Sequence, residues 1–348
     1  MEALTHRTKK VPMDQHGPTI YEVARRAGVS IATVSRALRG TGPVAPATRE
    51  KVLAAVKELR FTPSRLGVSL AEGRHAANGI VFPDLSGPYF AEVLLGYEEV
   101  ASELGRSVII LSRRGRTDIQ AQVRELAGRV DGLVVFGDIV DDAVVAELIA
   151  AGTPVVLLAR TPVEGADLVA SENTGSARAL AEHLIGHGYR DVALLGTPTG
   201  DDDIGERWAS AARTLAEHGV AAPPPVPCAL TVEGGLEAGR ALLRRDSVPE
   251  AVMCADDQLA LGVLLAAEEL GMSVPDNLAV TGWDDIMAAR HARPALTTVR
   301  QPMRELGARA ATALDQLITG ARTTARRQTL ATELVVRASC GAHPLEDQ

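Results

Sequence analysis

Several features that define other classes of protein are missing from this 348-residue sequence. Its three cysteines, Cys228, Cys254 and Cys340, are too few and too scattered for a disulfide framework or a zinc site. It has no run of about 18 apolar residues, so no membrane-spanning helix is expected. Residues 1–18 lack the apolar core of a signal peptide and are predicted to form a polar tail. A cytoplasmic protein is therefore expected.

Common catalytic patterns are also missing. The acidic pairs Asp256/Asp257 and Asp284/Asp285 have no histidine near them in sequence, and there is no serine elbow or phosphate-binding glycine loop. The run at 201–203 is expected to be a solvated loop rather than a metal site, because no histidine or further fixed acid accompanies it. We therefore expect no enzyme, no cofactor and no metal.

Charge is distributed unevenly along the chain. Residues 1–74 hold 13 Lys and Arg against six Asp and Glu, a net charge of +7. The remainder holds 23 against 38, so a small basic head precedes a large acidic body. A nucleic-acid-binding protein with a separate body has this arrangement, whereas the alternative is a solvated basic surface without a partner.

Residues 19–39, TIYEVARRAGVSIATVSRALR, have the pattern of two short amphipathic helices joined by a glycine turn. Thr19 and Glu22 have capping-box spacing, and Gly28 suits a turn that a residue with a Cβ would resist. Ser30 is expected to cap the second helix, whose first turns would then point outward. Such a helix can place side chains on base edges in a major groove, which predicts a helix-turn-helix domain.

A third helix should complete an all-α domain over residues 19–62. Pro46 can start this helix, and Phe61 would close the small core. The inward stripe is expected to consist of Val52, Leu53, Val56 and Leu59. Residues 63–75 are predicted to be a linker of weak helical character that could fold on a partner surface.

From residue 76 to 340, short apolar runs alternate with amphipathic helical stretches, and one expected strand is VPCAL at 226–230. Continuous apolar strands between helices indicate parallel sheets. There are too many strands for one comfortable sheet, which predicts an α/β body of two similar lobes facing a cleft. Lobe 1 is expected at about 76–172 and 299–325, lobe 2 at about 173–298 and 326–340, and a tail at 341–348.

Seven motifs follow one another in the order of a known family. They are VARRAGVSIATVSRAL in the head, FPDLSGPYF at 82–90, VDGLVVF at 130–136, HLIGHGYRDVALLG at 183–196, ADDQLALG at 255–262, GWDDI at 282–286 and PALTTVRQP at 294–302. From Thr19 to about Ser339 the chain resembles the LacI/GalR family of bacterial transcription regulators. The resemblance implies a helix-turn-helix head, a hinge helix and a two-lobed body similar to periplasmic sugar-binding proteins.

The resemblance implies that DNA is read by the first turns of the second helix. Arg36 is the strongest candidate, because a guanidinium can bridge guanine O6 and N7; a phosphate contact or a plain surface charge is the alternative. Ile31 and Ala32 offer only apolar contact. The hydroxyls of Ser30, Thr33 and Ser35 suit phosphate or helix-cap bonds. The full expected DNA-binding set is Thr19, Ser30, Ile31, Ala32, Thr33, Ser35, Arg36, Arg39, Ser64, Arg65, Gly67 and Leu70.

The same resemblance implies that residues 64–72 form a helix in the minor groove, with Leu70 as a wedge in the central base step. Two departures from the family pattern weaken this hinge. Gly67 replaces the usual alanine, which costs the helix about 0.5–1 kcal/mol, and Ser64 replaces a common asparagine. Ala45 also lacks the usual capping hydroxyl before the third helix.

The effector is expected to bind between the lobes, where the strands of open α/β sheets end. By resemblance, the binding residues are Asp84, Ser86, Tyr89, Phe90, Arg160, Arg207, Asp256, Trp283 and Asp284. Arg207 and two aspartates could hold adjacent hydroxyls, and Phe90 and Trp283 could stack on a sugar ring or a base. Alternatively, Trp283, Tyr89 and Phe90 pack into the protein, and Asp257 is a helix-start charge.

The predicted function is a repressor that binds a palindromic DNA operator as a homodimer and responds to a small polar effector, such as a sugar. The implied mechanism is a ligand-driven shift between two lobe orientations. Helix 89–104 and the neighbouring strand edge are the implied dimer surface. A purine or phosphosugar effector, a ligand-binding protein without a DNA role, and an enzyme on a similar fold are the alternatives.

Overall fold

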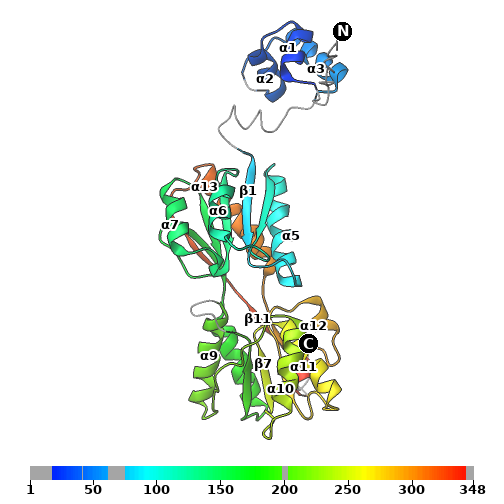
Figure 1. The fold of residues 1–348 in the computed structure, drawn as a ribbon, viewed down its shortest axis with the longest axis vertical. Coiled ribbons are helices and arrows are strands. Elements are labelled where there is room, and N and C mark those ends of the chain that lie inside the picture. Colours follow the sequence, from blue (N-terminus) through cyan, green and yellow to red (C-terminus); the bar gives the residue numbers. More distant parts are fainter. Residues whose placement is uncertain (1–17, 41, 62–74, 198–202, 342–348) are drawn as a thin grey trace, which may run out of the picture. The chain divides into compact units, whose positions relative to one another are not determined.

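The computed structural model describes residues 18–40, 42–61, 75–197 and 203–341. The chain divides into two compact units, residues 1–75 and 76–348, which are described separately below. Figure 1 traces the order of their elements along the chain. No helix within the described ranges is long and apolar enough to cross a membrane.

The first unit, here called the head, contains α1 (Ile20–Ala27), α2 (Ile31–Arg39) and α3 (Pro46–Leu59). The expected caps are present: the Thr19 amide donates to the Glu22 carboxylate at 2.7 Å, and Ser30 Oγ accepts from the Thr33 amide at 3.2 Å. Gly28 has a φ of +67°, the left-handed conformation that the turn between α1 and α2 requires.

One apolar core holds the three helices together. Its buried members are Val23, Ala24, Val34, Ala37, Val52, Ala55 and Phe61. The predicted stripe of α3 was wrong at Leu53, which is 49% exposed. Leu53 lies about 100° around the helix from Val52, whereas Ala55, three residues on, returns to the buried face. As expected, Ala45 gives α3 no side-chain cap.

The second unit, the body, has two lobes. Lobe 1 is built on a six-stranded parallel sheet with the strand order β10-β5-β4-β3-β1-β2. Its strands are β1 (Ala77–Phe82), β2 (Ser107–Ser112), β3 (Gly132–Phe136), β4 (Val155–Leu158), β5 (Asp167–Ser171) and β10 (Arg327–Leu330). Its helices are α5 (Pro88–Glu103), α6 (Ile119–Ala127), α7 (Asp142–Ala150), α13 (Met303–Ile318) and the 3₁₀ turn η1 (Gly137–Ile139).

Helices cover both faces of this sheet. One apolar cluster packs α6 and α7 against one face, and a second packs α5 and α13 against the other. In Figure 1, α5 and α6 accordingly lie on opposite sides of β1. The strands β1, β3, β4 and β5 are buried on both faces, which explains why β1, β3 and β4 are continuous apolar runs, whereas the outer strands β2 and β10 are partly exposed.

Lobe 2 has a three-stranded parallel sheet in the order β6-β7-β8 and one large apolar core. Its strands are β6 (Val192–Leu195), β7 (Ala251–Cys254) and β8 (Ala279–Thr281), joined by the antiparallel pair β9 (Thr298–Arg300) and β11 (Glu333–Val335). Its helices are α8 (Thr174–Gly186), α9 (Asp203–Glu217), α10 (Val232–Leu243), α11 (Asp257–Glu269), α12 (Met287–His291) and the 3₁₀ turn η2 (Ala338–Cys340).

Two sequence predictions about the body were wrong. Residues 226–230 form no regular strand: only Val226 makes an isolated bridge, to Leu195, because Pro225 and Pro227 lack amide donors. Residues 326–340 were assigned to lobe 2, but β10 pairs in parallel with β5 and so belongs to lobe 1. The chain therefore passes between the lobes three times, after β5, after β9 and after β10.

Glycines allow two helix pairs to pack closely. A Cβ added to Gly307 of α13 would lie 1.9 Å from the Val93 carbonyl oxygen, and one added to Gly96 of α5 would lie 1.9 Å from the Arg304 carbonyl oxygen. In lobe 2, α10 and α11 meet in the same way, with Gly235 facing Leu259. The backbones at these crossings leave no space for a side chain.

Candidate functional site

The exposed surface of α2 presents the residues predicted to read DNA. Ile31 is 39% exposed, and Ala32 and Arg36 are also exposed. Arg36 Nε donates to the Ala32 carbonyl oxygen at 3.3 Å, which holds the guanidinium stem along the first turns of the helix. A long cationic side chain on the first two turns of a capped helix is suited to contacting base edges.

The hydroxyls near α2 have a structural role. Ser30 Oγ lies 2.9 Å from Thr33 Oγ1, so these two groups complete the cap of the helix. Ser35 is half-buried, and the Thr19 hydroxyl donates to Glu22 at 3.2 Å. Ser64, Arg65, Gly67 and Leu70 lie outside the described residues, as does the side chain of Arg39.

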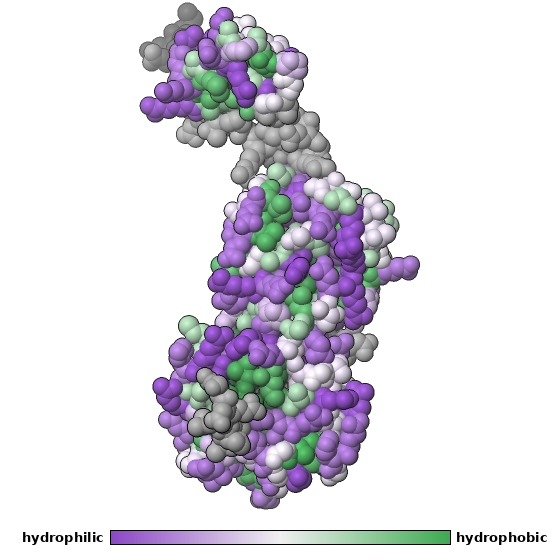
Figure 2. Space-filling model, turned by 180° about the vertical axis from the view of Figure 1, so that it is seen from behind, coloured by the Kyte–Doolittle hydropathy of each residue, from purple (hydrophilic) through white to green (hydrophobic). Residues whose placement is uncertain are grey.

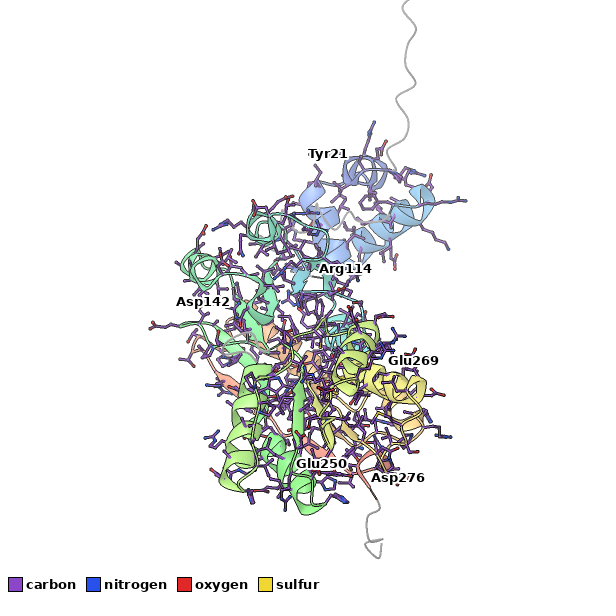
Figure 3. The ribbon with its side chains drawn as sticks, turned by 60° about the horizontal axis from the view of Figure 1, so that its bottom comes forward. Tyr21, Arg114, Asp142, Glu250, Glu269 and Asp276 are labelled. Carbon is purple, nitrogen blue, oxygen red and sulfur yellow. The ribbon has the colours of Figure 1, made fainter. Side chains whose placement is uncertain are left out.

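Tyr21 is a surface residue of the head that the sequence analysis did not select. It follows the first residue of α1, is 66% exposed and is labelled in Figure 3. An exposed phenol beside the cations of α1 is a suitable donor to a phosphate oxygen. The signal in the sequence was the aromatic residue between the inward positions Ile20 and Val23.

The body contains a cleft of about 640 Å³ where the two lobes join. It is lined by the turn after β4, the passage after β5, the first turns of α9 and part of β10. Its lining residues are Arg160, Thr161, Pro162, Ala170, Ser171, Glu172, Asn173, Thr174, Asp203, Gly205, Glu206, Ala209, Arg327 and Thr329. Of the nine predicted effector residues, Arg160 is in this lining.

Arg160 is held rigidly by its own lobe. Its guanidinium donates to the Val140 carbonyl oxygen at 2.8 Å and pairs with Asp138 at 3.3 Å and with Asp142. Asp142 begins α7 and is labelled in Figure 3. Because the side chain of Arg160 is only 1% exposed, it presents little more than one edge of its charge to the cleft.

Arg207 organises the adjoining part of lobe 2. It is buried on α9, where Nε donates to Asn173 Oδ1 at 2.9 Å and Nη1 donates to the Ala255 carbonyl oxygen at 3.0 Å. Its guanidinium carbon lies 4.4 Å from the centroid of the Trp283 ring, a cation–π contact. Asp203, one turn before Arg207, lies 3.9 Å from Nη2.

Trp283 is packed inside lobe 2 and is 2% exposed. The structure therefore agrees with the alternative in which this ring packs beside the cleft, because Arg207 covers the ring face on which a sugar would stack.

Asp284, the residue after Trp283, is also buried, and its Oδ1 accepts from Gln301 Nε2 at 2.7 Å. Its φ of +116° is a conformation that residues with a Cβ rarely adopt, so the turn is strained.

The carboxylates around Arg207 lie in a low-dielectric environment. Burial raises the pKa of Asp256 and, more strongly, the pKa of Asp284, which the charge of Asp257 raises further. Burial also raises the pKa of Asp257 to about 7, against hydrogen bonds from the Thr298 hydroxyl at 2.6 Å and the Ile286 amide at 2.8 Å. Asp257 is thus the first residue of α11, as the helix-start alternative has it, but it is buried and joins α11 to β9 inside lobe 2.

The residues predicted after β1 divide into two groups. Tyr89 packs edge-on against Phe90 and Phe136, with ring centroids 5.5 and 5.9 Å away, and burial, with the charges of Asp203 and Asp284, raises its pKa. Phe90 packs edge-on against Phe136 at 5.3 Å, which is the core-packing alternative. Asp84 instead accepts from the Ser86 amide at 2.9 Å and pairs with Arg114, labelled in Figure 3, at 3.2 Å.

Three further residues join this site that sequence reasoning did not select. Asn173 holds Arg207, Gln301 holds Asp284, and Asp203 lines the cleft beside Arg207. Asn173 and Gln301 lie where the chain passes between the lobes, after β5 and after β9, and this position was the sequence feature that could have identified them. Asp203 was expected in a solvated loop, but its side chain is only 18% exposed and it begins α9.

Comparison with known proteins identifies both units. Residues 19–64 match the bacterial regulatory proteins of the lacI family, and residues 181–340 match a periplasmic binding protein-like domain. The catabolite control protein A of Priestia megaterium is 32% identical over 302 residues, which cover 83% of this chain and 89% of the relative. This chain belongs to the LacI family.

Its other relatives agree with that assignment. The HTH-type transcriptional repressor PurR of Erwinia tasmaniensis is 31% identical over 336 residues, which cover 94% of this chain and 98% of the relative. The lac repressor dimer bound to operator and the anti-inducer ONPF superimposes with a TM-score of 0.83 at 28% identity, over 94% of this chain and all of the other. A CelR–cellobiose complex gives 0.70 at 33% identity, over 92% and 99%.

The family places the described surfaces in context. Membership makes this protein a DNA-binding transcription regulator with a helix-turn-helix head and a periplasmic binding protein-like body. The head and α2 therefore correspond to the DNA-binding part. The cleft, which combines the cations Arg160 and Arg327 of lobe 1 with the carboxylates Asp203 and Glu206 of lobe 2, lies in the body.

Proposed function

We propose that this LacI-family protein represses transcription from a palindromic operator as a homodimer, in the cytoplasm, and that a small sugar in the cleft between its lobes controls binding. The observation that carries this proposal is the pairing of an exposed reading helix with a polar cleft in one chain. The first turns of α2 leave Arg36 exposed, and the cleft of about 640 Å³ is of the size that a mono- or disaccharide fills.

The chemistry of the cleft favours a sugar over a purine. Glu172, Asp203 and Glu206 offer acceptors for adjacent hydroxyls, while the exposed Arg327 offers donors and Arg160 one edge of its guanidinium. Among the described residues, the cleft lining includes no aromatic side chain, and the Trp283 ring is covered by Arg207. A purine needs a flat stacking partner, whereas a ring of hydroxyls needs converging polar groups.

A homodimer is supported by the apolar surface of lobe 1. Leu95 of α5 and Leu104, the residue that follows this helix, are each 44% exposed, and Ile110 of β2 is 40% exposed. Since β2 is the last strand of its sheet, this edge and α5 together offer an apolar surface for a second copy. Apolar residues also interrupt the polar surface of both lobes on the face drawn in Figure 2.

The relatives are transcription regulators, and we infer that this protein likewise acts by binding rather than by catalysis. Three carboxylates of lobe 2 accept hydrogen bonds from within the protein. Asp256 accepts from the Leu259 amide at 2.8 Å, Asp257 accepts from the Ile286 amide and the Thr298 hydroxyl, and Asp284 accepts from Gln301. Turnover of a bound sugar would contradict this inference.

A gel-shift experiment tests the DNA-binding part. The full chain should bind a palindromic operator selected from a random library, and deletion of residues 1–74 should abolish binding while leaving a folded, dimeric body. Failure to select any palindrome, or full binding by the truncated protein, would refute the proposal.

The sugar is tested separately by a thermal-shift screen of the full chain with sugars, phosphosugars and nucleosides. A ligand that binds the folded state raises Tm with its concentration over Kd. A shift with sugars that also changes operator affinity supports the proposal. If every sugar is silent and purines raise Tm, the sugar assignment is wrong.

A further inference from the structure

Three potential metal ligands meet in lobe 2, away from the cleft. They are His183 of α8, His187, the residue that caps this helix, and Cys340 of η2, and their side-chain ligand atoms all lie within 4.8 Å of one another. His183 Nε2 is 3.2 Å from Cys340 Sγ, and the two imidazole rings are 4.8 Å apart in an edge-to-face arrangement. The cysteines are scattered in sequence, but folding brings one of them to a histidine pair.

We propose that His183, His187 and Cys340 bind a Zn²⁺ ion. Two histidines four residues apart on one helix face, with a thiolate from another element, supply the nitrogen and sulfur donors that zinc prefers. Ligands of one tetrahedral zinc, at about 2.0 Å for nitrogen and 2.3 Å for sulfur, stand about 3.5 Å from one another. The observed 3.2 Å between Nε2 and Sγ is close to that spacing.

The surroundings support a metal site. Thr297 Oγ1 lies 2.9 Å from Sγ, and the Tyr189 hydroxyl donates to the Cys340 carbonyl oxygen at 3.1 Å, so groups outside the ligand set orient the cysteine. Cys340 is completely buried, whereas both histidines are partly exposed. An ion can therefore enter from the histidine side, and a water molecule can complete four ligands.

The ion would join two parts of the chain that are distant in sequence. His183 and Cys340 are separated by 157 residues, and η2 follows the last strand of lobe 2. Binding of Zn²⁺ releases the thiol proton and fixes the end of the described chain to α8. The ion would thus stabilise lobe 2, and the proposed site uses no residue of the cleft or of the reading helix.

The test uses full-length, tag-free protein loaded with one equivalent of Zn²⁺ and then dialysed. Wild-type protein should retain about one zinc per chain by mass spectrometry, and Co²⁺ in its place should give thiolate-to-metal charge-transfer absorption. His187→Ala should weaken Co²⁺ binding at least about tenfold, since even partners outside the ligand set are worth 10–100-fold. Zinc should raise Tm of the wild type and not of the variant.

Two further variants complete the experiment. Cys340→Ser should abolish the charge-transfer absorption, whereas Cys228→Ser, at a half-buried cysteine elsewhere in lobe 2, should keep it. If Cys340→Ser fails to fold, the partly exposed His187→Ala still decides the question. A wild type that loses its zinc on dialysis, or variants that keep it at wild-type affinity, would overturn the site and leave an ordinary histidine–cysteine hydrogen bond.

Discussion

The guanidinium carbon of Arg207 lies 4.4 Å from the centroid of the Trp283 ring. This contact joins α9 to the turn after β8, while Nε and Nη1 of the same guanidinium donate to Asn173 and to the Ala255 carbonyl oxygen. One buried cation thus connects a passage between the lobes, the N-terminal region of α9 and the edge of the cleft. A ligand that attracts or displaces Arg207 would move three elements at once.

Arg207→Lys is expected to weaken sugar binding about tenfold, or about 1.4 kcal/mol. Lysine keeps the charge but cannot stack on Trp283 while donating in a planar fork to Asn173 and Ala255. The matched control is Arg213→Lys on the exposed face of the same helix, which should bind normally. Calorimetry with the sugar found in the screen measures both. Equal affinity of wild type and Arg207→Lys would remove Arg207 from the site.

The pH dependence of stability should report Asp257. Burial raises its pKa to about 7 in the folded protein, against 3.8 for an ordinary aspartate. Between these two pH values the folded state holds a proton that the unfolded state has released, so stability falls as pH rises from about 4 to about 7. Below that window the contribution is fully present.

Asp257→Asn should flatten this part of the profile. The amide oxygen can still accept from the Ile286 amide, and the amide nitrogen can donate to the Thr298 hydroxyl, so both contacts of the native carboxyl are kept. Denaturant melts at several pH values measure how steeply the free energy of unfolding changes with pH. Part of this dependence should remain in the variant, because the pKa values of Asp256 and Asp284 are also raised. An unchanged slope in Asp257→Asn would mean that Asp257 is ionised throughout.

Local patterns made the head predictable. The caps at Thr19 and Ser30 and the left-handed turn at Gly28 depend on neighbouring residues alone, so spacing was enough to place α1 and α2. The apolar runs of the body were also sufficient for most strands of the two parallel sheets, although the run at 226–230 forms no strand. Pairing between segments distant in sequence could not be predicted in this way. β10 joins lobe 1 through its pairing with β5, and its residues, RQTL, do not indicate this partner.

The candidate site shows the same limit. Arg207 and Asp284 were found by resemblance, but their orientation is fixed by Asn173 and Gln301, which a motif search has no reason to select. Trp283 was ambiguous because sequence does not show which side chain covers an aromatic ring. The grouping of Cys340 with His183 and His187 likewise exists only after lobe 2 has folded.

Gly307→Ala should destabilise lobe 1 by about 1–3 kcal/mol or more, the usual cost of overpacking. The new methyl group would meet the Val93 carbonyl oxygen at 1.9 Å, and backbone atoms on both helices resist displacement. Gly186→Ala in α8 is the control, since a Cβ there meets nothing within 4 Å, and it should be neutral or stabilising. Urea melts compare the two; an unaffected Gly307→Ala would mean that α13 can shift freely.

Arg36→Ala should cost about 1–3 kcal/mol of operator affinity and relax the preference at one base position in each half-site. The side chain is exposed on the first turns of α2, and its neighbours Ile31 and Ala32 have no hydrogen-bonding groups, so base reading by the helix depends on it. Selection from a randomised operator library, followed by binding titrations at fixed salt, measures affinity and base preference together.

The control is Arg26→Ala, which removes a cation of α1 that is paired with Glu58 of α3 at 2.8 Å, and which should lower affinity equally for all operator sequences. If Arg36→Ala behaves like Arg26→Ala and leaves the preferred sequence unchanged, Arg36 contacts phosphate, and specificity must come from elsewhere on the protein.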